Sequence, residues 1–330
     1  KQTTERAILR SCRSLGRHVS GRLPHSRDDN KAMVDLIEDE RRDAKMEFDE
    51  SYYKGKTAVV TGAASGVGLA LIEELLAYGA EKVVLADFNK ENLEKHTARL
   101  SAEYPGRVKG ILCDVTKESE VAAMIAGAAE FFGGRIDLLV NNAGAGLMGL
   151  FVAPPSSISI EEIKGVKIQT NSDWERAFAL NFYGALYGCR EVIPVMRRNG
   201  GGQVINVISG IVFYPMAYQT MYAATKAALN GLTLSLRYEY WDDNIKFNSA
   251  TPGTTATGIW GDSPAPQGAQ TPKQSARRIL AQASRNRRVI FGDDPDEAGA
   301  KNCFHPDYEE IPDTYLLEVA RARRGGEIRV

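Results

Sequence analysis

From residue 56 onward, short apolar runs alternate along the chain with longer amphipathic stretches. The runs, rich in Val, Ile and Leu, indicate buried strands, whereas apolar residues spaced three or four apart indicate helices. Strands are predicted at Thr57–Val60, Lys82–Ala86, Arg107–Leu112, Ile136–Val140, Gln203–Val207 and Lys246–Ser249. Helices are predicted at Leu69–Tyr78, Lys90–Glu103, Glu118–Phe132, Trp174–Arg198 and Met221–Trp241. This alternation is typical of βαβ units that build a parallel sheet.

The pattern therefore predicts the α/β class, with a single Rossmann-type, doubly wound parallel sheet and helices on both of its faces. We assign this catalytic domain to residues 55–290. Two segments interrupt its rhythm. Residues 145–172 form an insertion far longer than the usual connection, and residues 254–272 have the Gly, Pro, Thr and Ala content of a mobile substrate loop. Because ligands of such sheets bind at the carboxyl ends of the strands, we expect the functional residues there.

The segments on either side of this domain have a different character. In the N-terminal extension, residues 1–54, Arg6, Arg10, Arg13 and Arg17 fall on one face of a predicted helix. An organelle transit peptide has this Arg-rich, acid-poor character. We favour a solvated basic helix or an arm on a neighbouring subunit, because nothing else in the chain indicates an organelle. Docking on a membrane surface or a partner, alongside catalysis, is a further alternative.

The C-terminal tail covers residues 291–330 and includes a short helix predicted at Tyr315–Ala320. We expect the tail to fold over the substrate mouth or over a neighbouring subunit. A solvated end is the alternative.

Composition narrows the classes of partner. Among the 330 residues, 41 Lys and Arg balance 42 Asp and Glu, so the net charge of −1 argues against nucleic acid as a main partner. No apolar run approaches the roughly 20 residues that span a bilayer, so we predict no transmembrane segment. The four cysteines are scattered without a CxxC pair, which favours reduced thiols, a cytoplasmic location and no metal site.

The strongest motif is the glycine-rich turn Thr61–Gly68, which lies between the first predicted strand and the first predicted helix. Glycines at such a turn permit close approach of the backbone to a pyrophosphate, whose charge is favoured at a helix N-terminus. Asp87 ends the second strand, 19 residues after Gly68. A carboxylate there would accept hydrogen bonds from the adenosine ribose and repel a 2′-phosphate, so NAD is predicted as cofactor rather than NADP. An ordinary strand-end acid that caps the next helix is the alternative for Asp87.

A second motif supplies proton chemistry. Tyr222 and Lys226 are four residues apart in a predicted helix and therefore lie on one face of it. An ammonium near a phenol lowers the pKa of the phenol, which a general acid or base requires. Ser209 ends the preceding strand, where its hydroxyl can reach the same carbonyl oxygen of a substrate.

Taken together, these residues resemble the short-chain dehydrogenase/reductase family, in its NAD-preferring, hydroxysteroid-dehydrogenase-like form. The resemblance spans roughly residues 55–260 and rests on motifs that occur in the family's order. They are Thr61-Gly62-x-x-x-Gly66-x-Gly68, Asp114-Val115, Asn141-Asn142-Ala143-Gly144, Asn181, Ser209, Tyr222-x-x-x-Lys226 and Pro252-Gly253.

The resemblance implies a role for each residue. Tyr222 would exchange a proton with the substrate oxygen, Ser209 would orient and polarise that oxygen, and Lys226 would lower the Tyr222 pKa and hold the nicotinamide ribose. Asn181 would anchor a water that relays protons between Lys226 and solvent. Asp114 would contact adenine, Asn141–Gly144 would support the sheet beside the cofactor, and Pro252–Gly253 would bound the nicotinamide pocket. The predicted cofactor-binding residues are Gly62, Ser65, Gly66, Val67, Gly68, Asp87, Phe88, Asp114, Val115, Asn142, Ala143, Gly144, Tyr222, Lys226, Pro252, Gly253 and Thr255.

These inferences predict an oxidoreductase that moves a hydride between NAD(H) and a secondary alcohol or its ketone. The residues expected to line the substrate pocket are apolar or aromatic, which favours a bulky hydrophobic substrate such as a steroid or an alicyclic alcohol. They are Met148, Phe213, Tyr214, Met216, Tyr218, Ile259 and Trp260.

Several alternatives stay open. Half of the apolar pocket residues could fill a core or a subunit interface instead. The substrate could be a polyol, a sugar or a 3-oxoacyl group, with NADP as cofactor. The presence of Ser209, Tyr222 and Lys226 argues against a dinucleotide sensor without turnover. By resemblance, we expect a homodimer or homotetramer built on the helices placed at 174–198 and 221–241.

Overall fold

A computed structural model describes residues 48–153, 166–258, 264–303, 305 and 310–324. The sheet with its flanking helices belongs to a compact unit that begins at Asp49. Most of the predicted N-terminal extension, residues 1–47, lies outside the described residues, and so do the predicted pocket residues Ile259 and Trp260.

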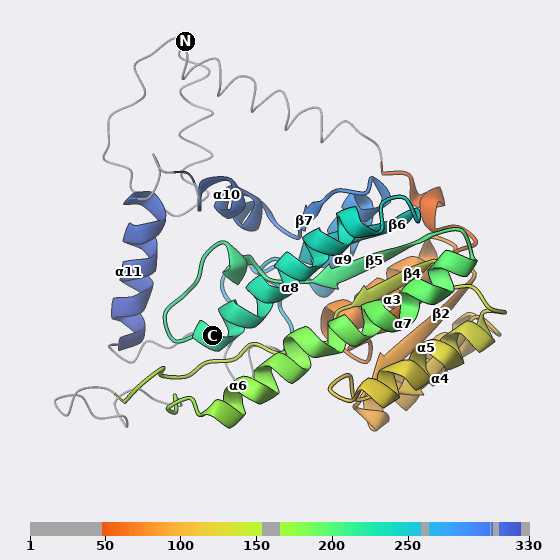
Figure 1. The fold of residues 1–330 in the computed structure, drawn as a ribbon, viewed down its shortest axis with the longest axis horizontal. Helices are drawn as coiled ribbons and strands as arrows, with labels where there is room; N and C mark the ends of the chain where they lie inside the picture. The colour runs from red at the N-terminus through yellow and green to blue at the C-terminus, as the bar shows by residue number, and fades with distance from the viewer. Residues whose placement is uncertain (1–47, 154–165, 259–263, 304, 306–309, 325–330) are drawn as a thin grey trace, which may run out of the picture. The chain divides into compact units, whose positions relative to one another are not determined.

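The centre of the unit is a seven-stranded parallel sheet in the order β3-β2-β1-β4-β5-β6-β7 (Figure 1). This confirms the predicted doubly wound α/β fold, with one strand more than expected. The added strand β7 is only three residues long, and so short a run carries too weak a pattern to be recognised in the sequence. The strands are β1 (Thr57–Thr61), β2 (Lys82–Asp87), β3 (Val108–Leu112), β4 (Leu138–Asn141), β5 (Gly202–Val207), β6 (Ile245–Thr251) and β7 (Val289–Phe291).

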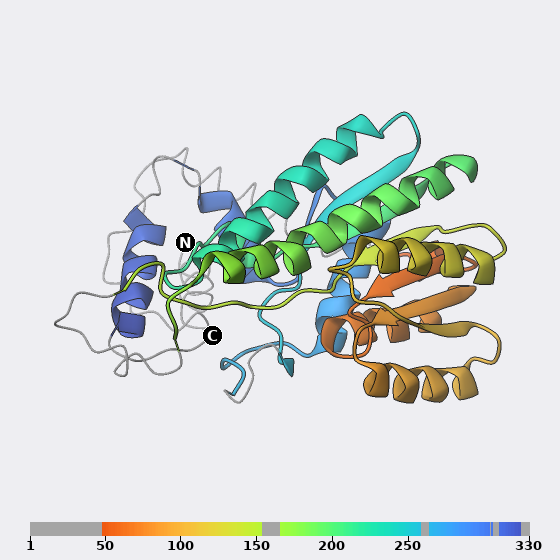
Figure 2. The same ribbon diagram turned by 60° about the horizontal axis from the view of Figure 1, so that its bottom comes forward.

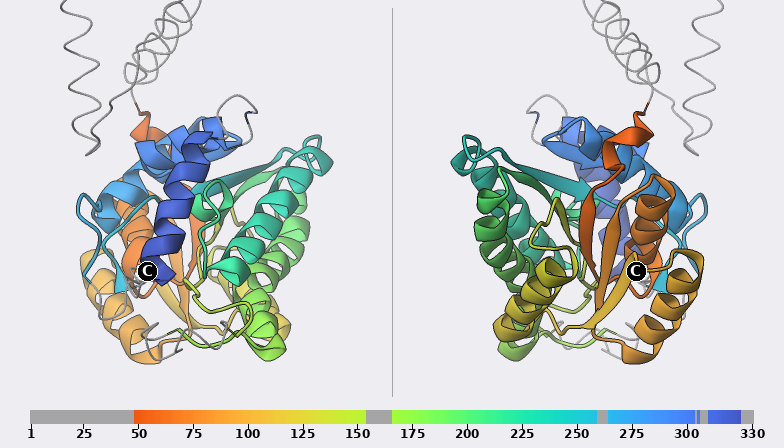
Figure 3. Two further views of the ribbon diagram at one scale, coloured as in Figure 1. Left: turned by 90° about the vertical axis from the view of Figure 1, so that its left-hand side faces the viewer. Right: turned by 90° about the vertical axis from the view of Figure 1, so that its right-hand side faces the viewer.

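Helices cover both faces of the sheet (Figures 2 and 3). On one face α3 packs against α9 and α4 lies over β2 and β3, whereas α5, α7 and α8 cover the other face. The helices are α3 (Gly66–Ala77), α4 (Lys90–Glu103), α5 (Glu118–Phe131), α7 (Gly184–Arg198), α8 (Thr220–Glu239) and α9 (Pro272–Ser284). Helix α9 was not predicted, although its start carries a capping box between Thr271 and Gln274.

Residues just before the first strand also belong to this unit. The short helix η1 (Glu50–Tyr53) packs against α9. The Tyr53 ring is fully buried, and its hydroxyl donates a hydrogen bond to the Leu280 carbonyl at 2.7 Å. The fold therefore includes residues that the sequence pattern places in the N-terminal extension.

The long helix predicted at Trp174–Arg198 is interrupted. It consists of α6 (Asn171–Phe178), a π-helical turn η3 (Ala179–Tyr183) and α7. A π-turn inserts one residue into the helical repeat and is frequent at functional sites. Here it carries Asn181, whose side chain forms hydrogen bonds outside the helix. The apolar pattern continues through the turn, so the interruption was not visible in the sequence.

The C-terminal tail forms two helices, α10 (Asp294–Asn302) and α11 (Glu310–Arg324). They follow β7 and lie on the side of the sheet toward which the strands point (Figure 1). Helix α11 is longer than the predicted Tyr315–Ala320 segment. In the described part of the chain, no helix is long and apolar enough to cross a membrane.

Candidate active site

The sheet order places the glycine-rich turn at a topological switch point. The chain winds outward from β1 through β2 and β3, then returns to β4 on the other side of β1. The connections from β1 and β4 therefore diverge, which leaves a crevice at their carboxyl ends where ligands of such sheets bind.

The turn after β1 is shaped for close contact with another group. Gly62 and Gly66 have φ values of +63° and +52°, which favour glycine. A Cβ atom on Gly68 would lie 2.8 Å from the Gly62 carbonyl carbon and 2.6 Å from Asn142 Nδ2, closer than real Cβ contacts come. The N-cap residue Ser65 forms no side-chain hydrogen bond with α3. The first N–H groups of the helix therefore lie in a narrow turn suited to a pyrophosphate.

Asp87 joins this turn to the end of β2. Its carboxylate is buried and accepts hydrogen bonds from the backbone N–H groups of Ala64 and Asn89, each at 2.9 Å. The helix α4 that follows is capped by Asn89 rather than by Asp87. Asp87 is thus held against the glycine turn, and the free lone pairs of its oxygens can accept further hydrogen bonds.

The Asn141–Gly144 segment supports the same turn from β4. Asn142 Nδ2 donates to the carbonyls of Thr61 and Gly62 at 2.9 and 3.2 Å. Asn141 lies deeper, where its Nδ2 donates to Asn206 Oδ1 at 2.8 Å across the β4–β5 pair. Ala143 N–H donates to Thr61 Oγ1 at 3.1 Å. This segment therefore fixes the crevice from the sheet side.

The other predicted cofactor contacts surround the crevice. Asp114 follows β3 and accepts hydrogen bonds from Thr116, which hold the pKa of its carboxyl below the usual value. Val115 is buried against Gly184, and Phe88 is exposed to solvent. On the opposite side, the Pro252 carbonyl accepts from Ser275 Oγ at 2.6 Å and from Thr255 Oγ1 at 3.0 Å.

The residues predicted to transfer protons converge beside this crevice. Ser209 follows β5, and its hydroxyl lies close enough to the Tyr222 phenol of α8 to influence the pKa of that phenol through hydrogen bonding. One turn further along α8, Lys226 is buried and its Nζ donates to the Val207 carbonyl at 2.9 Å. A Cβ on Gly144 would lie 3.1 Å from Lys226 Nζ, so Gly144 leaves open the side of the ammonium that faces the crevice.

The pKa directions correct one sequence-based expectation. Burial raises the pKa of Tyr222, with the Ser209 hydrogen bond acting in the opposite direction. Burial also lowers the pKa of Lys226 to about 8. The sequence predicted that Lys226 lowers the Tyr222 pKa, but in the protein without cofactor the Tyr222 pKa is raised. The Lys226 ammonium donates to a backbone carbonyl, and desolvation is the largest effect on the pKa of both groups.

Similarity to known proteins shows the family to which the chain belongs. A model of the short chain dehydrogenase family matches residues 56–268, more than half of the chain. The chain belongs to the short-chain dehydrogenase family. As a member, it is an oxidoreductase that acts on hydroxyl groups, and its fold binds a nicotinamide dinucleotide.

Similar relatives within this family differ in their named substrates. D-beta-hydroxybutyrate dehydrogenase of Rhizobium meliloti is 32% identical over 202 residues, covering 61% of this chain and 72% of the relative. 3beta-hydroxysteroid dehydrogenase 2 of Eggerthella lenta is 32% identical over 206 residues, covering 62% of this chain and 73% of the relative. A short chain dehydrogenase from Burkholderia cenocepacia, solved in complex with NADP, has a TM-score of 0.66 at 25% identity, covering 80% of this chain and 98% of that structure.

Asn181 lies next to the predicted catalytic residue Lys226, since a Cβ on Gly144 would approach both side chains. Its side chain is fully buried and exchanges hydrogen bonds with the Ala145 backbone, accepting from the N–H at 3.0 Å and donating to the carbonyl at 3.1 Å. Its Nδ2 also approaches Thr225 Oγ1 at 3.3 Å. Asn181 thus ties the π-turn to the segment that follows Gly144, next to Lys226.

The predicted substrate-pocket residues are held by two other segments. Tyr218 packs against Leu150 and Val166 of the 145–172 insertion, whose Gly149 N–H donates to the Tyr218 carbonyl at 2.8 Å. Phe213 is buried in a hydrophobic cluster beside the Phe291 ring. Met148 is partly buried in the insertion.

The C-terminal tail makes the remaining contacts with this region. The Tyr214 ring packs edge to face on Tyr315 of α11, with centroids 6.2 Å apart. Arg323, also on α11, is buried and donates to the Ala217 carbonyl at 2.6 Å and to Met216 Sδ at 3.5 Å. The tail therefore covers the Phe213–Gln219 segment of its own chain. This segment contains residues that the sequence analysis predicted to line the substrate pocket.

Two residues near the site were not identified from the sequence. Thr257 lies next to the glycine turn, since a Cβ on Gly66 would lie 3.3 Å from Thr257 Cγ2. Asp296 of α10 lies against Gly210, directly after Ser209. No spacing rule connects residue 296 to Ser209, because the two meet only through the path of the tail.

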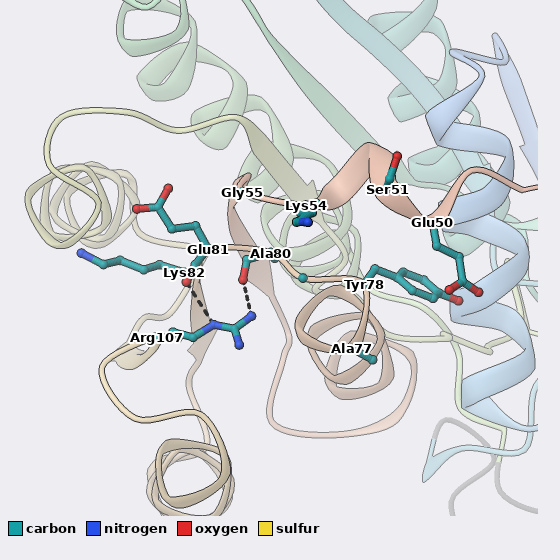
Figure 4. Close-up of a pocket in the computed structure, with 11 residues that line it drawn as sticks. Glu50, Ser51, Lys54, Gly55, Ala77, Tyr78, Ala80, Glu81, Lys82 and Arg107 are labelled. Carbon is teal, nitrogen blue, oxygen red and sulfur yellow. Dashed lines mark hydrogen bonds between the residues drawn. The ribbon is translucent and has the colours of Figure 1, made fainter.

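A pocket at the opposite end of the sheet is not part of this chemistry. It lies beside the amino ends of β1 and β2 and includes Tyr78, Lys82 and Arg107 (Figure 4). The Arg107 guanidinium donates to the carbonyls of Ala80 and Glu81. Its hydrogen-bonding capacity is thus used largely by the backbone, and the Ser209–Tyr222 pair lies at the other ends of the strands.

Proposed function

We propose that the protein is an NAD(H)-dependent dehydrogenase that interconverts a secondary alcohol and its ketone. The observation that carries this proposal is the convergence of Ser209, Tyr222 and Lys226 beside the glycine turn. A dinucleotide fits the turn because Gly62, Gly66 and Gly68 leave a cradle that side chains would fill. When bound, the nicotinamide supplies the hydride acceptor or donor.

The chain's own residues handle the proton. In alcohol oxidation, the Tyr222 phenolate would take the hydroxyl proton while the Ser209 hydroxyl orients the substrate oxygen. In ketone reduction, the phenol would return that proton. Lys226 would hold the nicotinamide ribose, and Asn181 would anchor the water that leads protons from Lys226 to solvent. The positive charge of an oxidised nicotinamide would lower the Tyr222 pKa, whereas burial raises it.

The preference for NAD rests on Asp87. A 2′-phosphate would meet a buried carboxylate already held by two backbone N–H groups, so the carboxylate could not easily turn away. Ribose hydroxyls, in contrast, could donate to its remaining lone pairs. NADP is the alternative cofactor, as in the similar Burkholderia cenocepacia structure.

For the substrate, we propose a bulky hydrophobic alcohol such as a steroid or an alicyclic compound. Met148, Tyr214 and Tyr218 are partly buried and would contribute apolar or aromatic surface to the pocket, and a similar relative is named a 3beta-hydroxysteroid dehydrogenase. A polyol, a sugar or a 3-oxoacyl substrate is the alternative, and a sensor without turnover is a distant one.

The test is an absorbance assay of the reduced cofactor with NAD or NADP and a panel of steroid, alicyclic, polyol and acyl-type alcohols. We expect NAD-dependent turnover on bulky apolar alcohols and its loss in Tyr222→Phe. Preference for NADP would contradict the role of Asp87. Tight NAD binding without turnover on any alcohol would favour the sensor instead.

We also propose a homodimer or homotetramer built on α7 and α8. A groove between these helices is lined by Ile193, Leu232 and Leu236, and the nearby rings of Tyr238 and Trp241 are exposed. Light scattering is expected to give a mass of two or four chains, reduced by Trp241→Glu. A wild-type mass of one chain would contradict this assembly.

A further inference from the structure

Helix α10 brings a carboxyl group of the C-terminal tail to the turn that carries Ser209. The helix contacts both β7 and the short helix η4 (Gly210–Val212), which begins immediately after Ser209. A Cβ on Gly210 would lie 2.7 Å from Asp296 Cγ and 3.1 Å from Asp296 Oδ2. Only glycine at position 210 lets the carboxyl group come this close to the backbone of the turn.

One oxygen of this carboxyl group lacks a hydrogen-bond partner among the described residues. Asp296 Oδ2 is buried and has no hydrogen-bond partner within the described part of the chain. Buried polar atoms nearly always have a hydrogen-bond partner, so burying an unpaired carboxylate oxygen costs folding free energy. This cost suggests a role other than stabilising the fold. The carboxyl group that carries this oxygen lies against Gly210, directly after Ser209.

The charges around Asp296 are few. On its own helix, Asp293 caps the first turn and accepts a hydrogen bond from the Asp296 N–H at 2.9 Å. On α8, the titratable group whose pKa Asp296 influences is the Tyr222 phenol. The parts of η4, β6 and β7 that pack nearby contribute Gly210, Thr251 and apolar residues, none of which is charged.

Burial and the neighbouring Asp293 carboxylate raise the pKa of Asp296 to about 7, against weaker hydrogen bonding from Thr251 and Gly253. In turn, an ionised Asp296 raises the pKa of Tyr222. Because the carboxyl group ionises before the phenol, Tyr222 would lose its proton beside an existing negative charge.

We propose that Asp296 is a positioning residue of the reaction, whose carboxylate, held against the Ser209–Gly210 turn, sets how readily Tyr222 gives up its proton. A charged Asp296 disfavours the phenolate that alcohol oxidation needs and favours the phenol that ketone reduction needs. The inference rests on the proposed function, since it assigns to the tail an influence on the acid–base residue of that reaction.

The test compares Asp296→Asn with wild type over a range of pH, following kcat/KM for alcohol oxidation and for ketone reduction. Removal of the charge is expected to move the Tyr222 limb of both profiles to lower pH by about half a unit or more. Asp294→Asn is the matched control, because Asp294 lies on the same helix, is exposed and pairs with Arg278. Its profiles are expected to coincide with those of wild type.

Profiles of Asp296→Asn that coincide with wild type would overturn the proposal. If the Asn variant loses its cooperative thermal transition, Asp296→Ser is the second uncharged variant and is expected to show the same shift. A measurement without turnover separates this inference from the proposed function. Tyrosinate absorbance is titrated with NAD bound, and the Tyr222 signal is obtained by subtracting Tyr222→Phe. An unchanged Tyr222 titration in the uncharged variant refutes the role of Asp296 even if no alcohol is turned over.

Discussion

Replacement of Gly68 by alanine tests how tightly the glycine turn is built. The new methyl group would lie 2.6 Å from Asn142 Nδ2 and 2.8 Å from the Gly62 carbonyl carbon. One of these neighbours is backbone and the other holds the turn through hydrogen bonds to Thr61 and Gly62. The turn must therefore open, and the opening would displace the N–H groups that are expected to bind the pyrophosphate.

The magnitude follows from two opposing effects. Overpacking of a rigid site costs about 1–3 kcal/mol, whereas alanine in a helix is favoured over glycine by about 1 kcal/mol. A net loss of about 1 kcal/mol would lower the Tm by roughly 2–4 °C. If the whole strain falls on the bound state, the Kd for NADH rises about tenfold for each 1.4 kcal/mol.

The assay is titration of the Gly68→Ala variant with NADH, together with thermal unfolding with and without NADH. Gly127→Ala is the matched control on α5, where the new methyl group would lie 3.5 Å from Ile111 Cδ1, an ordinary contact. We expect the control to keep the wild-type Kd and to gain slightly in Tm. A Gly68→Ala variant with the wild-type Kd and an unchanged or higher Tm would refute the close contact inferred for the turn.

Four further predictions concern other residues of the candidate site and of the C-terminal tail. Tyr222→Phe is expected to lower kcat/KM for alcohol oxidation by about 10²–10⁴, measured by cofactor absorbance, with unchanged NADH binding as the control. Asp87→Ser is expected to raise kcat/KM with NADPH relative to NADH, and an unchanged ratio would contradict the role of Asp87. Arg323→Met leaves the Ala217 carbonyl and Gln219 Oε1 without their donor, so it is expected to cost about 1–3 kcal/mol of unfolding free energy and to raise KM, unlike the exposed Arg324→Met. The folded-state pKa of Asp296 is raised to about 7, so the folded protein binds more protons than the unfolded chain from about pH 4 to 7 and loses stability as pH rises through that window. Asp296→Asn should therefore flatten the fall in Tm between those pH values, and an equal fall in both proteins would contradict the raised pKa.

The Gly68 and Tyr222 predictions rest on residues that the sequence itself identified. Local signals were sufficient there, because a glycine turn between a strand and a helix and a Tyr-x-x-x-Lys pair on one helical face are short-range patterns. The Asp296 and Arg323 predictions rest on contacts between residues far apart in the chain. Asp296 meets the Ser209–Gly210 turn, and Arg323 meets the Met216–Gln219 segment, only because the tail folds back over the end of the sheet.

The interrupted helix shows a limit of periodicity. The apolar spacing from Trp174 to Arg198 is continuous, and it predicted one helix because nothing local marks a π-turn. The turn forms where Asn181 exchanges hydrogen bonds with the Ala145 backbone, a partner 36 residues earlier in the chain. The seventh strand was missed for a related reason, since a three-residue strand is recognisable only from its pairing with β6. Helix α9 was missed although a local signal, the Thr271–Gln274 capping box, marks its start.

By itself, the sequence determined the α/β class, most strand positions, the glycine turn and the Ser209, Tyr222 and Lys226 set, because period and spacing are properties of neighbouring residues. Only the tertiary structure decided the pKa directions of the predicted proton-transfer residues and the contacts of the residues predicted to line the substrate pocket. Burial sets the pKa directions of Tyr222 and Lys226, and burial depends on everything packed around a group rather than on its neighbours in the chain. The same holds for α10 and α11, whose contacts with the site depend on where the chain goes after β7.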